Sequence, residues 1–241
     1  MHADETVVEV RKDGRPAGAE SRMWVYRSGE LESKPVILYE FQKTRKKEHA
    51  REFLKDFSGI CVTDGYQLYH SIADEREDLT ISGCWSHARR GFADVVKAAG
   101  KKALNIRESV AYKSLQLIQT ISRCEEKFAK LEPAERLEAR IHHILPLADA
   151  FFAYLKSKEG SVAPKSATGK AISYCLNQEA FLRVILTYSY VPMTNNRRTQ
   201  YPAIYSRKKQ LVPDRYSQRS KSKCDRLQHC RDGEGKSVET L

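Results

Sequence analysis

The chain has 241 residues and a mass of 27.6 kDa; 41% of its residues are hydrophobic and 30% are charged. This length is enough for one large or two small domains with a hydrophobic core. The chain contains no run of eighteen apolar residues, which excludes a membrane-spanning helix. We expect no secretory signal, because the first ten residues contain no basic segment followed by an apolar one.

Cysteine spacing and charge narrow the class of protein further. The six cysteines are scattered without a CxxC pair, which argues against a disulfide scaffold or a zinc ribbon and favours buried free thiols. The formal net charge is +11, and residues 197–241 hold 12 Lys and Arg against 5 Asp and Glu. This excess suggests a polyanionic partner such as DNA, although a basic tail without a partner has the same composition.

Strand and helix patterns alternate over the first hundred residues. Apolar residues three and four positions apart predict a helix over Lys46–Phe57, and a second helix is predicted over Ser86–Ala99, before Gly100. Runs rich in β-branched and aromatic residues, separated by turn residues, predict strands. These strands are Thr6–Val10, Met23–Arg27, Val36–Phe41, Ile60–Thr63 and Leu79–Trp85.

The middle of the chain has helical periodicity from about Ala103 to Lys158, with an interruption expected at Pro146. A loop and two short helices follow, and a turn is predicted at Pro192 and at Asn195-Asn196. Beyond Arg197 no period survives, and the basic, apolar-poor segment is predicted to be disordered. The loop is Glu159–Ala163, and the two helices are Ala167–Asn177 and Glu179–Leu186.

Two acids stand out by their position. Asp4 lies at the start of the first strand, and Asp64 ends the fourth strand before a glycine. Three antiparallel strands, a helix and a further strand are the order of a ribonuclease H-like core, in which acids on the first and fourth strands lie side by side. Two such carboxylates could bridge two Mg²⁺ ions about 3.5–4 Å apart. The alternative is that Asp4 caps a segment and Asp64-Gly65 forms a simple turn.

Several segments closely resemble the insertion-sequence transposases of the sixty-six family, which use an Asp-Asp-Glu metal site. The resemblance runs in family order over nearly all of residues 2–196, and it implies that Asp4 and Asp64 are the first two catalytic acids. It also implies two Mg²⁺ ions, DNA as the partner and a helical insertion before the third acid. The matching segments are HADETVVEV (2–10), MWVYRSG (23–29), PVILYEFQKTR (35–45), EHAREFL (48–54), FSGICVTDGYQLYH (57–70), GCWSHARRGF (83–92), PKSATGKAISYCLNQ (164–178) and PMTNN (192–196).

The third acid of the family is missing here. In the family a Glu lies three residues after the Asn-Asn turn, whereas Asn196 is followed here by RRTQYPAIY. Codons for residues 197–202, read one nucleotide later, can encode Ala-Glu-Arg-Ser-Ile-Arg, and residues 206–212 and 220–236 also permit family-like readings in a shifted frame. We therefore hypothesise that the chain is translated out of frame from about Arg197. The nucleotide sequence tests this hypothesis, because codons incompatible with the shifted reading would contradict it.

The N-terminus also departs from the family. Met1 stands where the family has an apolar residue inside a longer chain, so the resemblance implies a fragment that lacks the family's upstream cysteine-rich DNA-binding segment. With two of three metal ligands, the fragment is expected to show no strand transfer by itself. We expect it in the bacterial cytoplasm, associated with the nucleoid, as a homo-oligomer or bound to full-length transposase.

Basic residues near the predicted site are candidates for DNA contacts. His87, Arg89 and Arg90 follow Trp85 at a strand-to-helix junction, and arginines and a helix N-terminus both suit phosphate. Lys165 and Lys170 lie before the Asn-Asn turn and are further candidate phosphate contacts. The alternatives are a solvated helix start and ordinary helix-surface charges.

Three residues near the acids have simpler interpretations. His2 could orient the active site, but we expect it to lie in a frayed terminus. Strand alternation is expected to turn Glu5 to the face opposite Asp4. Glu179 is the nearest helix-borne substitute for the third acid, but it precedes the turn and is expected to point elsewhere.

The predicted fold is therefore α/β, a mixed five-stranded ribonuclease H-like sheet with flanking helices and an α-helical insertion. The predicted function is that of a transposase catalytic-domain fragment, inactive by itself. The alternatives are a non-catalytic DNA-binding or inhibitory fragment that associates with full-length transposase, and a metal-dependent nuclease of the same fold. The predicted divisions are a catalytic core over 1–100, a helical insertion over 101–163, the end of the catalytic domain over 164–196 and a basic tail over 197–241.

Overall fold

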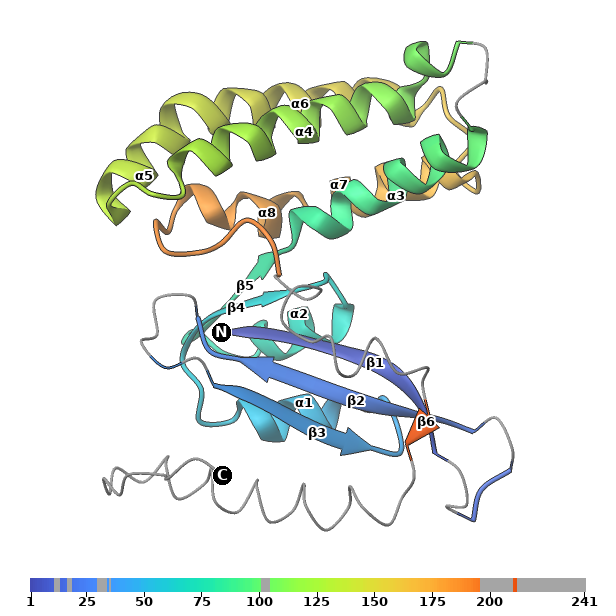
Figure 1. Cartoon of the computed structure of the whole chain (residues 1–241), viewed down its shortest axis with the longest axis vertical. Helices are drawn as coiled ribbons and strands as arrows, with labels where there is room; N and C mark the ends of the chain where they lie inside the picture. Colours follow the sequence, from blue (N-terminus) through green and yellow to red (C-terminus); the bar gives the residue numbers. More distant parts are fainter. Residues whose placement is uncertain are drawn as a thin grey trace. The chain divides into compact units, whose positions relative to one another are not determined.

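The computed structural model describes residues 1–10, 14–16, 19–29, 34, 36–100, 105–195 and 210–211. These residues form two compact units, each with its own hydrophobic core (Figure 1). The strand unit comprises His2–Lys55 together with the short strand at 210–211, and the helical unit comprises Met1 and Asp56–Asn195. The disorder predicted for residues 197–241 lies, apart from 210–211, outside the described residues.

The strand unit is an antiparallel meander of β1 (His2–Val10), β2 (Glu20–Arg27) and β3 (Ile37–Gln42). A short strand β6 (Gln210–Leu211) pairs with β1 in parallel. Val8, Met23 and Val25 form the core of one face, and on the other the ring of Tyr26 stacks on Phe53 of the helix α1. That helix spans Lys47–Leu54. The three predicted strands and the predicted helix are thus present, with ends that differ by a few residues.

β1 begins four residues earlier than predicted. Its pairing with β2 runs from His2 opposite Arg27 to Glu9 opposite Glu20, so the long partner strand extends the pairing through the polar segment at its start. Tertiary pairing here overrides the low strand propensity of that segment. His2 is only 2% exposed, so the expectation of a frayed terminus is wrong.

The helical unit contains two parallel strands, β4 (Gly59–Thr63) and β5 (Leu79–Gly83), joined through the helix α2 (Gln67–Ala73). The sequence analysis did not predict α2, because seven residues are too few to show helical periodicity and four of them are buried. Antiparallel pairing in one unit and parallel pairing in the other confirm the α/β class.

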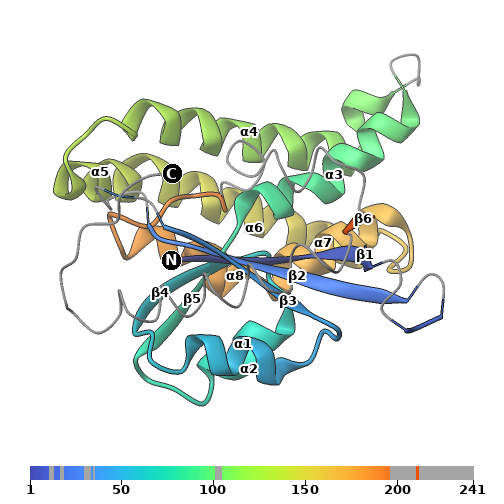
Figure 2. The ribbon, with the colours of Figure 1, turned by 60° about the horizontal axis from the view of Figure 1, so that its bottom comes forward.

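A pair of long helices, α4 and α6, and several further helical segments complete this unit. α4 and α6 pack along each other in both views, and α3 packs against α7 (Figures 1 and 2). None of the described helices is both long enough and apolar enough to cross a bilayer. The elements are α3 (Trp85–Ala99), a 3-10 turn (Ile106–Glu108), α4 (Val110–Phe128), α5 (Pro133–Ala139), a π-helical segment (Arg140–Ile144), α6 (Leu145–Glu159), α7 (Ala167–Asn177), α8 (Glu179–Leu182) and a second 3-10 turn (Arg183–Leu186).

At Pro146 the structure shows a change of helix type where an interruption of the helix was predicted. The helical run continues through this position, with the π-helical segment directly before it and Pro146 in the first turn of α6. A proline has no N–H to donate and clashes with the preceding turn of a regular α-helix, and a π-helical turn changes the bonding pattern at that point. The proline therefore alters the local helix type without ending the helix.

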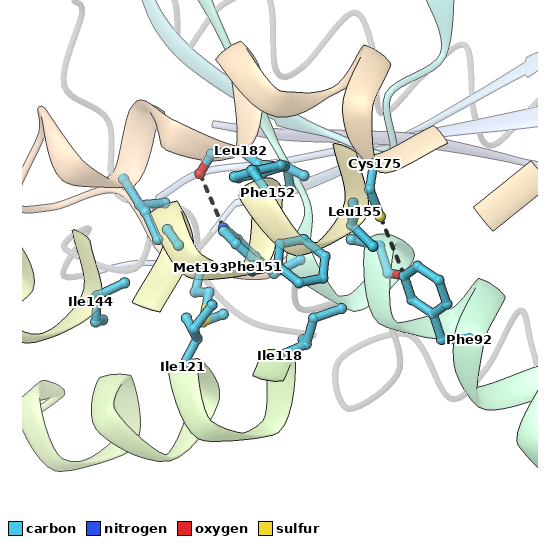
Figure 3. Packing of buried hydrophobic residues seen from close by; sticks show 14 of the residues in the cluster. Phe92, Ile118, Ile121, Ile144, Phe151, Phe152, Leu155, Cys175, Leu182 and Met193 are labelled. Carbon is cyan, nitrogen blue, oxygen red and sulfur yellow. Dashed lines mark hydrogen bonds between the residues drawn. The ribbon is translucent and has the colours of Figure 1, made fainter. Parts of the chain in front are cut away.

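Aromatic and aliphatic side chains fill the core of the helical unit (Figure 3). Trp85 is buried beside Phe151 and Phe152 of α6, and its indole N–H donates to the Leu182 carbonyl at 3.0 Å. This packing explains why β5 ends at Gly83 and Trp85 already belongs to α3, where the strand was predicted to reach Trp85. Cys61, Cys84 and Cys175 are buried free thiols, as predicted, whereas Cys124 is a free thiol that is only partly buried.

Candidate active site

Asp64 lies directly after β4, at the edge of the parallel pair where Thr63 faces Gly83. Gly65 follows with a φ of +86°, and the Oδ1 atom of Asp64 accepts a hydrogen bond from the Tyr66 N–H at 3.0 Å. This local bond is typical of an Asx turn and orders the carboxylate. Asp64 is half-buried, so its carboxylate is both ordered and in contact with solvent.

Two side chains from the end of α7 contact this turn. The Tyr174 hydroxyl donates to the main-chain carbonyl of Asp64 at 2.7 Å, and Gln178 Nε2 lies 3.5 Å from the Gly65 carbonyl oxygen. Burial, followed by the neighbouring negative groups including Asp64, raises the pKa of Tyr174 well above its usual range. The hydroxyl therefore keeps its proton and acts as a donor at physiological pH.

The same sheet edge also holds the turn that follows α8. Cys84 comes directly after β5, and its sulfur accepts a hydrogen bond from the Asn195 N–H at 3.1 Å. The next residue, Trp85, donates its N–H to the Met193 carbonyl at 3.1 Å. Asp64 and the predicted Pro192–Asn195 turn are therefore both attached to the carboxyl ends of β4 and β5.

Asp4 belongs to the strand unit. It lies within β1 opposite Val25, is 4% exposed, and accepts a hydrogen bond on Oδ1 from the N–H of Glu5 at 2.7 Å. Glu5 itself forms an ion pair with Arg45, whose Nε lies 2.8 Å from Oε1. The Glu5 carboxylate is thus paired with the Arg45 guanidinium. The pairing of Asp4 with Asp64 stays a prediction.

The five candidate nucleic-acid contacts are all in the helical unit. Arg89 and Arg90 are exposed in the first turns of α3, and His87 is half-buried there. Lys170 is exposed on α7. Lys165, also exposed, lies just before Ser166, the N-cap of α7.

The helices that carry these residues, α3 and α7, approach each other closely. A Cβ added at Gly91 of α3 would lie 2.8 Å from the Cβ of Ala171 on α7. Arg90 and Lys170 are the residues next to these two positions. Arg90 and Lys170 therefore lie one residue away from this helix contact, while His87, Arg89 and Lys165 lie along the same two helices or beside them.

Glu179 forms ion pairs with two basic side chains. Its carboxylate lies 2.8 Å from Lys156 Nζ and 2.9 Å from Arg183. Burial by itself raises the pKa of Glu179, but the hydrogen bonds and charges of these two cations lower it below its ordinary value. Glu179 therefore serves an ion-pair network, which agrees with the expectation that it does not replace the third acid. Within the described ranges, no three or more His, Cys, Asp or Glu side chains gather in a way that could hold a metal ion.

The sequence analysis missed Tyr174 and Gln178 as site residues. Both lie in the segment 164–178 that carries the family resemblance, and they are four positions apart, which places them on one side of a helix. The sequence pattern that could have identified them is two polar residues at this spacing beside the apolar positions Ala171, Ile172 and Cys175, which are buried in the structure.

A family model described as Transposase IS66 family matches residues 1–208, so the match continues past Asn196. Curated relatives come from Sinorhizobium fredii. The uncharacterized protein y4qI is 27% identical over 223 residues, covering 88% of this chain and 40% of its own length. The uncharacterized protein y4jD is 26% identical over 206 residues, covering 81% of this chain and 39% of its own length. The chain thus spans about 40% of the length of these relatives. No solved structure matches the chain.

Proposed function

The chain belongs to the Transposase IS66 family, and from this premise we propose that it is part of the catalytic domain of a DNA transposase with a ribonuclease H-like sheet. The order of elements supports this proposal: three antiparallel strands, a helix, a strand, a helix and a strand, followed by a helical insertion. The intact protein would cleave a phosphodiester at a transposon end and join the freed end to target DNA, in the cytoplasm at the nucleoid.

Asp4 and Asp64 would hold divalent metal, with Mg²⁺ the expected ion. Carboxylate oxygens are the donors that Mg²⁺ prefers, and Asp64 offers an ordered carboxylate in contact with solvent. Backbone bonds also tie the start of the chain to β4: the Met1 amino group donates to the Ile60 carbonyl at 2.8 Å, and the Val62 N–H donates to the Met1 carbonyl at 2.9 Å.

Bound metal would supply Lewis acidity at the phosphate. The residues of the chain would supply position and charge. Arg89, Arg90, Lys165 and Lys170 carry exposed cations on or beside α3 and α7, and we propose that they neutralise DNA phosphates. His87 lies in the first turn of α3, where N–H groups and the helix dipole also favour phosphate.

We propose that this chain by itself does not carry out strand transfer. Thr199 stands where the family resemblance places the third acid, and a two-metal site with two carboxylates is short of a ligand. The same observation favours a second function, in which the chain binds transposon-end DNA or full-length transposase and inhibits it.

The decisive experiment restores the third acid. In the full chain, replacement of residues 198–203 by Ala-Glu-Arg-Ser-Ile-Arg puts a glutamate at position 199 and leaves the Asn-Asn turn intact, and we expect Mg²⁺-dependent nicking of transposon-end DNA only after this change. Asp64→Asn in the restored chain abolishes nicking, while Asp56→Asn, at an exposed acid, does not. Nicking by the unchanged chain would contradict its proposed inactivity, and nicking that survives Asp64→Asn would overturn the assignment of the site.

The inhibitory function has a separate readout. A gel shift with transposon-end DNA and a pull-down with full-length transposase test whether the unchanged chain engages either partner. Replacing Arg90 and Lys170 together with glutamate is expected to weaken the gel shift at least tenfold, because two phosphate contacts become repulsive. An unaltered gel shift would remove these two cations from the proposed DNA contacts.

A further inference from the structure

We propose that Tyr174 and Gln178 are positioning residues that hold the Asp64 carboxylate in the orientation needed to bind a divalent metal ion. The inference rests on the proposed function of Asp64 as a metal ligand. It concerns only contacts within the helical unit.

The two side chains fix consecutive peptide groups. Tyr174 donates to the carbonyl of Asp64 at 2.7 Å, and the Gln178 amide lies 3.5 Å from the carbonyl of Gly65. The direction of the Asp64 side chain depends on the orientation of the peptide planes beside its Cα. The Asp64 carbonyl belongs to the peptide plane that follows this Cα, and the Gly65 carbonyl belongs to the next plane. Tyr174 therefore limits the direction of the Asp64 carboxylate, and Gln178 holds the turn that carries it.

Gly65 completes the arrangement. Its φ of +86° belongs to the left-handed region, and a Cβ at this position would lie 2.8 Å from the Gln178 side chain and 3.0 Å from the Tyr174 hydroxyl. The turn thus fits against these two side chains only when residue 65 has no Cβ. Tyr174 and Gln178 are in turn held by α7 and α8: the Gln178 N–H donates to the Tyr174 carbonyl at 3.0 Å, and the Gln178 carbonyl accepts from the Leu182 N–H at 2.9 Å.

Packing alone gives no reason for a glutamine at position 178. The residue is 6% exposed, and its Oε1 atom has no hydrogen-bond partner among the described residues. A buried polar atom without a partner costs free energy, so a leucine of similar size would satisfy a purely structural role at least as well. A positioning role beside Asp64 accounts for the amide, because partners of metal ligands orient those ligands.

The test measures binding of Mn²⁺, used as a probe for Mg²⁺, to the full chain by electron paramagnetic resonance titration. We expect Asp64→Asn to abolish the binding seen in the wild type. Tyr174→Phe and Gln178→Leu each weaken Mn²⁺ affinity about tenfold, the lower end of the range for partners of metal ligands. The control is Tyr154→Phe, which removes a hydroxyl from a half-buried tyrosine of α6.

The thermal unfolding midpoint separates positioning from stability. Gln178→Leu removes a buried unpartnered atom, so we expect its midpoint to equal or exceed that of the wild type while its Mn²⁺ affinity falls. Wild-type affinity in both Tyr174→Phe and Gln178→Leu, or an equal loss in Tyr154→Phe, overturns the positioning role and leaves Asp64 as a ligand. If Tyr174→Phe does not fold, Gln178→Leu alone decides.

Failure of the proposed function has a different signature. If the wild type binds no Mn²⁺, or if Asp64→Asn binds as well as the wild type, Asp64 is not a metal ligand and the positioning role is overturned with it. The positioning role fails alone when Asp64→Asn loses binding and either Tyr174→Phe and Gln178→Leu both keep it or Tyr154→Phe weakens it equally.

Discussion

Two buried polar arrangements in the helical unit use acids in opposite ways. Glu125 of α4 is 7% exposed and is neutralised by two arginines: Arg140 Nε lies 2.9 Å from its Oε2, and Arg136 Nε lies 3.1 Å from its Oε1. Asp64, by contrast, is half-buried. Its carboxylate accepts a hydrogen bond from the Tyr66 N–H, and its main-chain oxygen accepts one from the Tyr174 hydroxyl. Glu125 is thus neutralised by ion pairs within the protein, whereas the Asp64 turn is ordered by neutral hydrogen-bond donors.

Arg140, the partner of Glu125, connects the helical insertion to a later segment of the chain. Its guanidinium is fully buried and also donates to carbonyls of the segment after α8, those of Ile185 at 3.0 Å, Tyr188 at 3.1 Å and Val191 at 2.9 Å. The Glu125–Arg140 pair therefore ties the helical insertion to the segment that leads to the Asn195 turn. The contrast teaches that arginines commit Glu125 to the fold, whereas neutral N–H and O–H donors order the Asp64 turn without adding a positive charge.

The largest expected effect on stability comes from breaking the buried ion pair between Glu125 and Arg140. Arg140→Met leaves Glu125 buried with one arginine fewer and removes the donor to four carbonyls, so we expect a loss of about 3–5 kcal/mol in the free energy of unfolding. Urea denaturation of the full chain measures it. A loss below about 1 kcal/mol would show that the pair does not hold the insertion.

The pH dependence of stability sharpens the same contrast. Burial by itself raises the pKa of Glu125, but the hydrogen bonds and charges of Arg140 and Arg136 lower it below its ordinary value of 4.5. Because the folded-state pKa is depressed, the stabilisation is fully present above about pH 4.5 and is lost as the pH falls through the folded-state pKa. The difference in unfolding free energy between wild type and Glu125→Gln is expected to narrow over that range. A difference that stays constant down to pH 3 contradicts the assignment.

An intermediate effect is expected at the Asp64 turn. Gly65→Ala forces a side chain into the left-handed region and against Gln178, with an expected cost of about 1–3 kcal/mol. The matched control is Gly160→Ala, since a Cβ there meets nothing within 4 Å and its φ is −74°. Adding Gln178→Ala is expected to recover part of the Gly65→Ala loss in urea denaturation. Full additivity of the two changes would argue against contact between the two positions.

The smallest effect is expected for the exposed network at Glu179. Lys156→Ala removes an ion pair of 2.8 Å whose lysine side chain is 60% exposed. Solvent screens such a pair, so the expected loss is about 0.2–1 kcal/mol, and it shrinks in high salt. Thermal unfolding at low and high ionic strength measures both. A loss as large as that of Arg140→Met would erase the distinction between buried and exposed pairs.

Local sequence determined most of the elements and the family. Periodicity located the helix Ala167–Asn177 with the bounds that the structure gives it, and runs of β-branched residues located every strand of the first hundred residues. The family resemblance stated from the motifs is confirmed by the match over residues 1–208. These features are local in the chain, so a single sequence carries them.

Tertiary structure alone decided the features that depend on partners distant in sequence. Pairing with β2 extended β1 to His2, and burial of four of its residues made α2 a helix although it is too short for a periodic signal. The positions of Tyr174 and Gln178 beside Asp64 join residues more than a hundred positions apart. A sequence pattern reports the spacing along one element, whereas contacts between elements depend on how the whole unit packs.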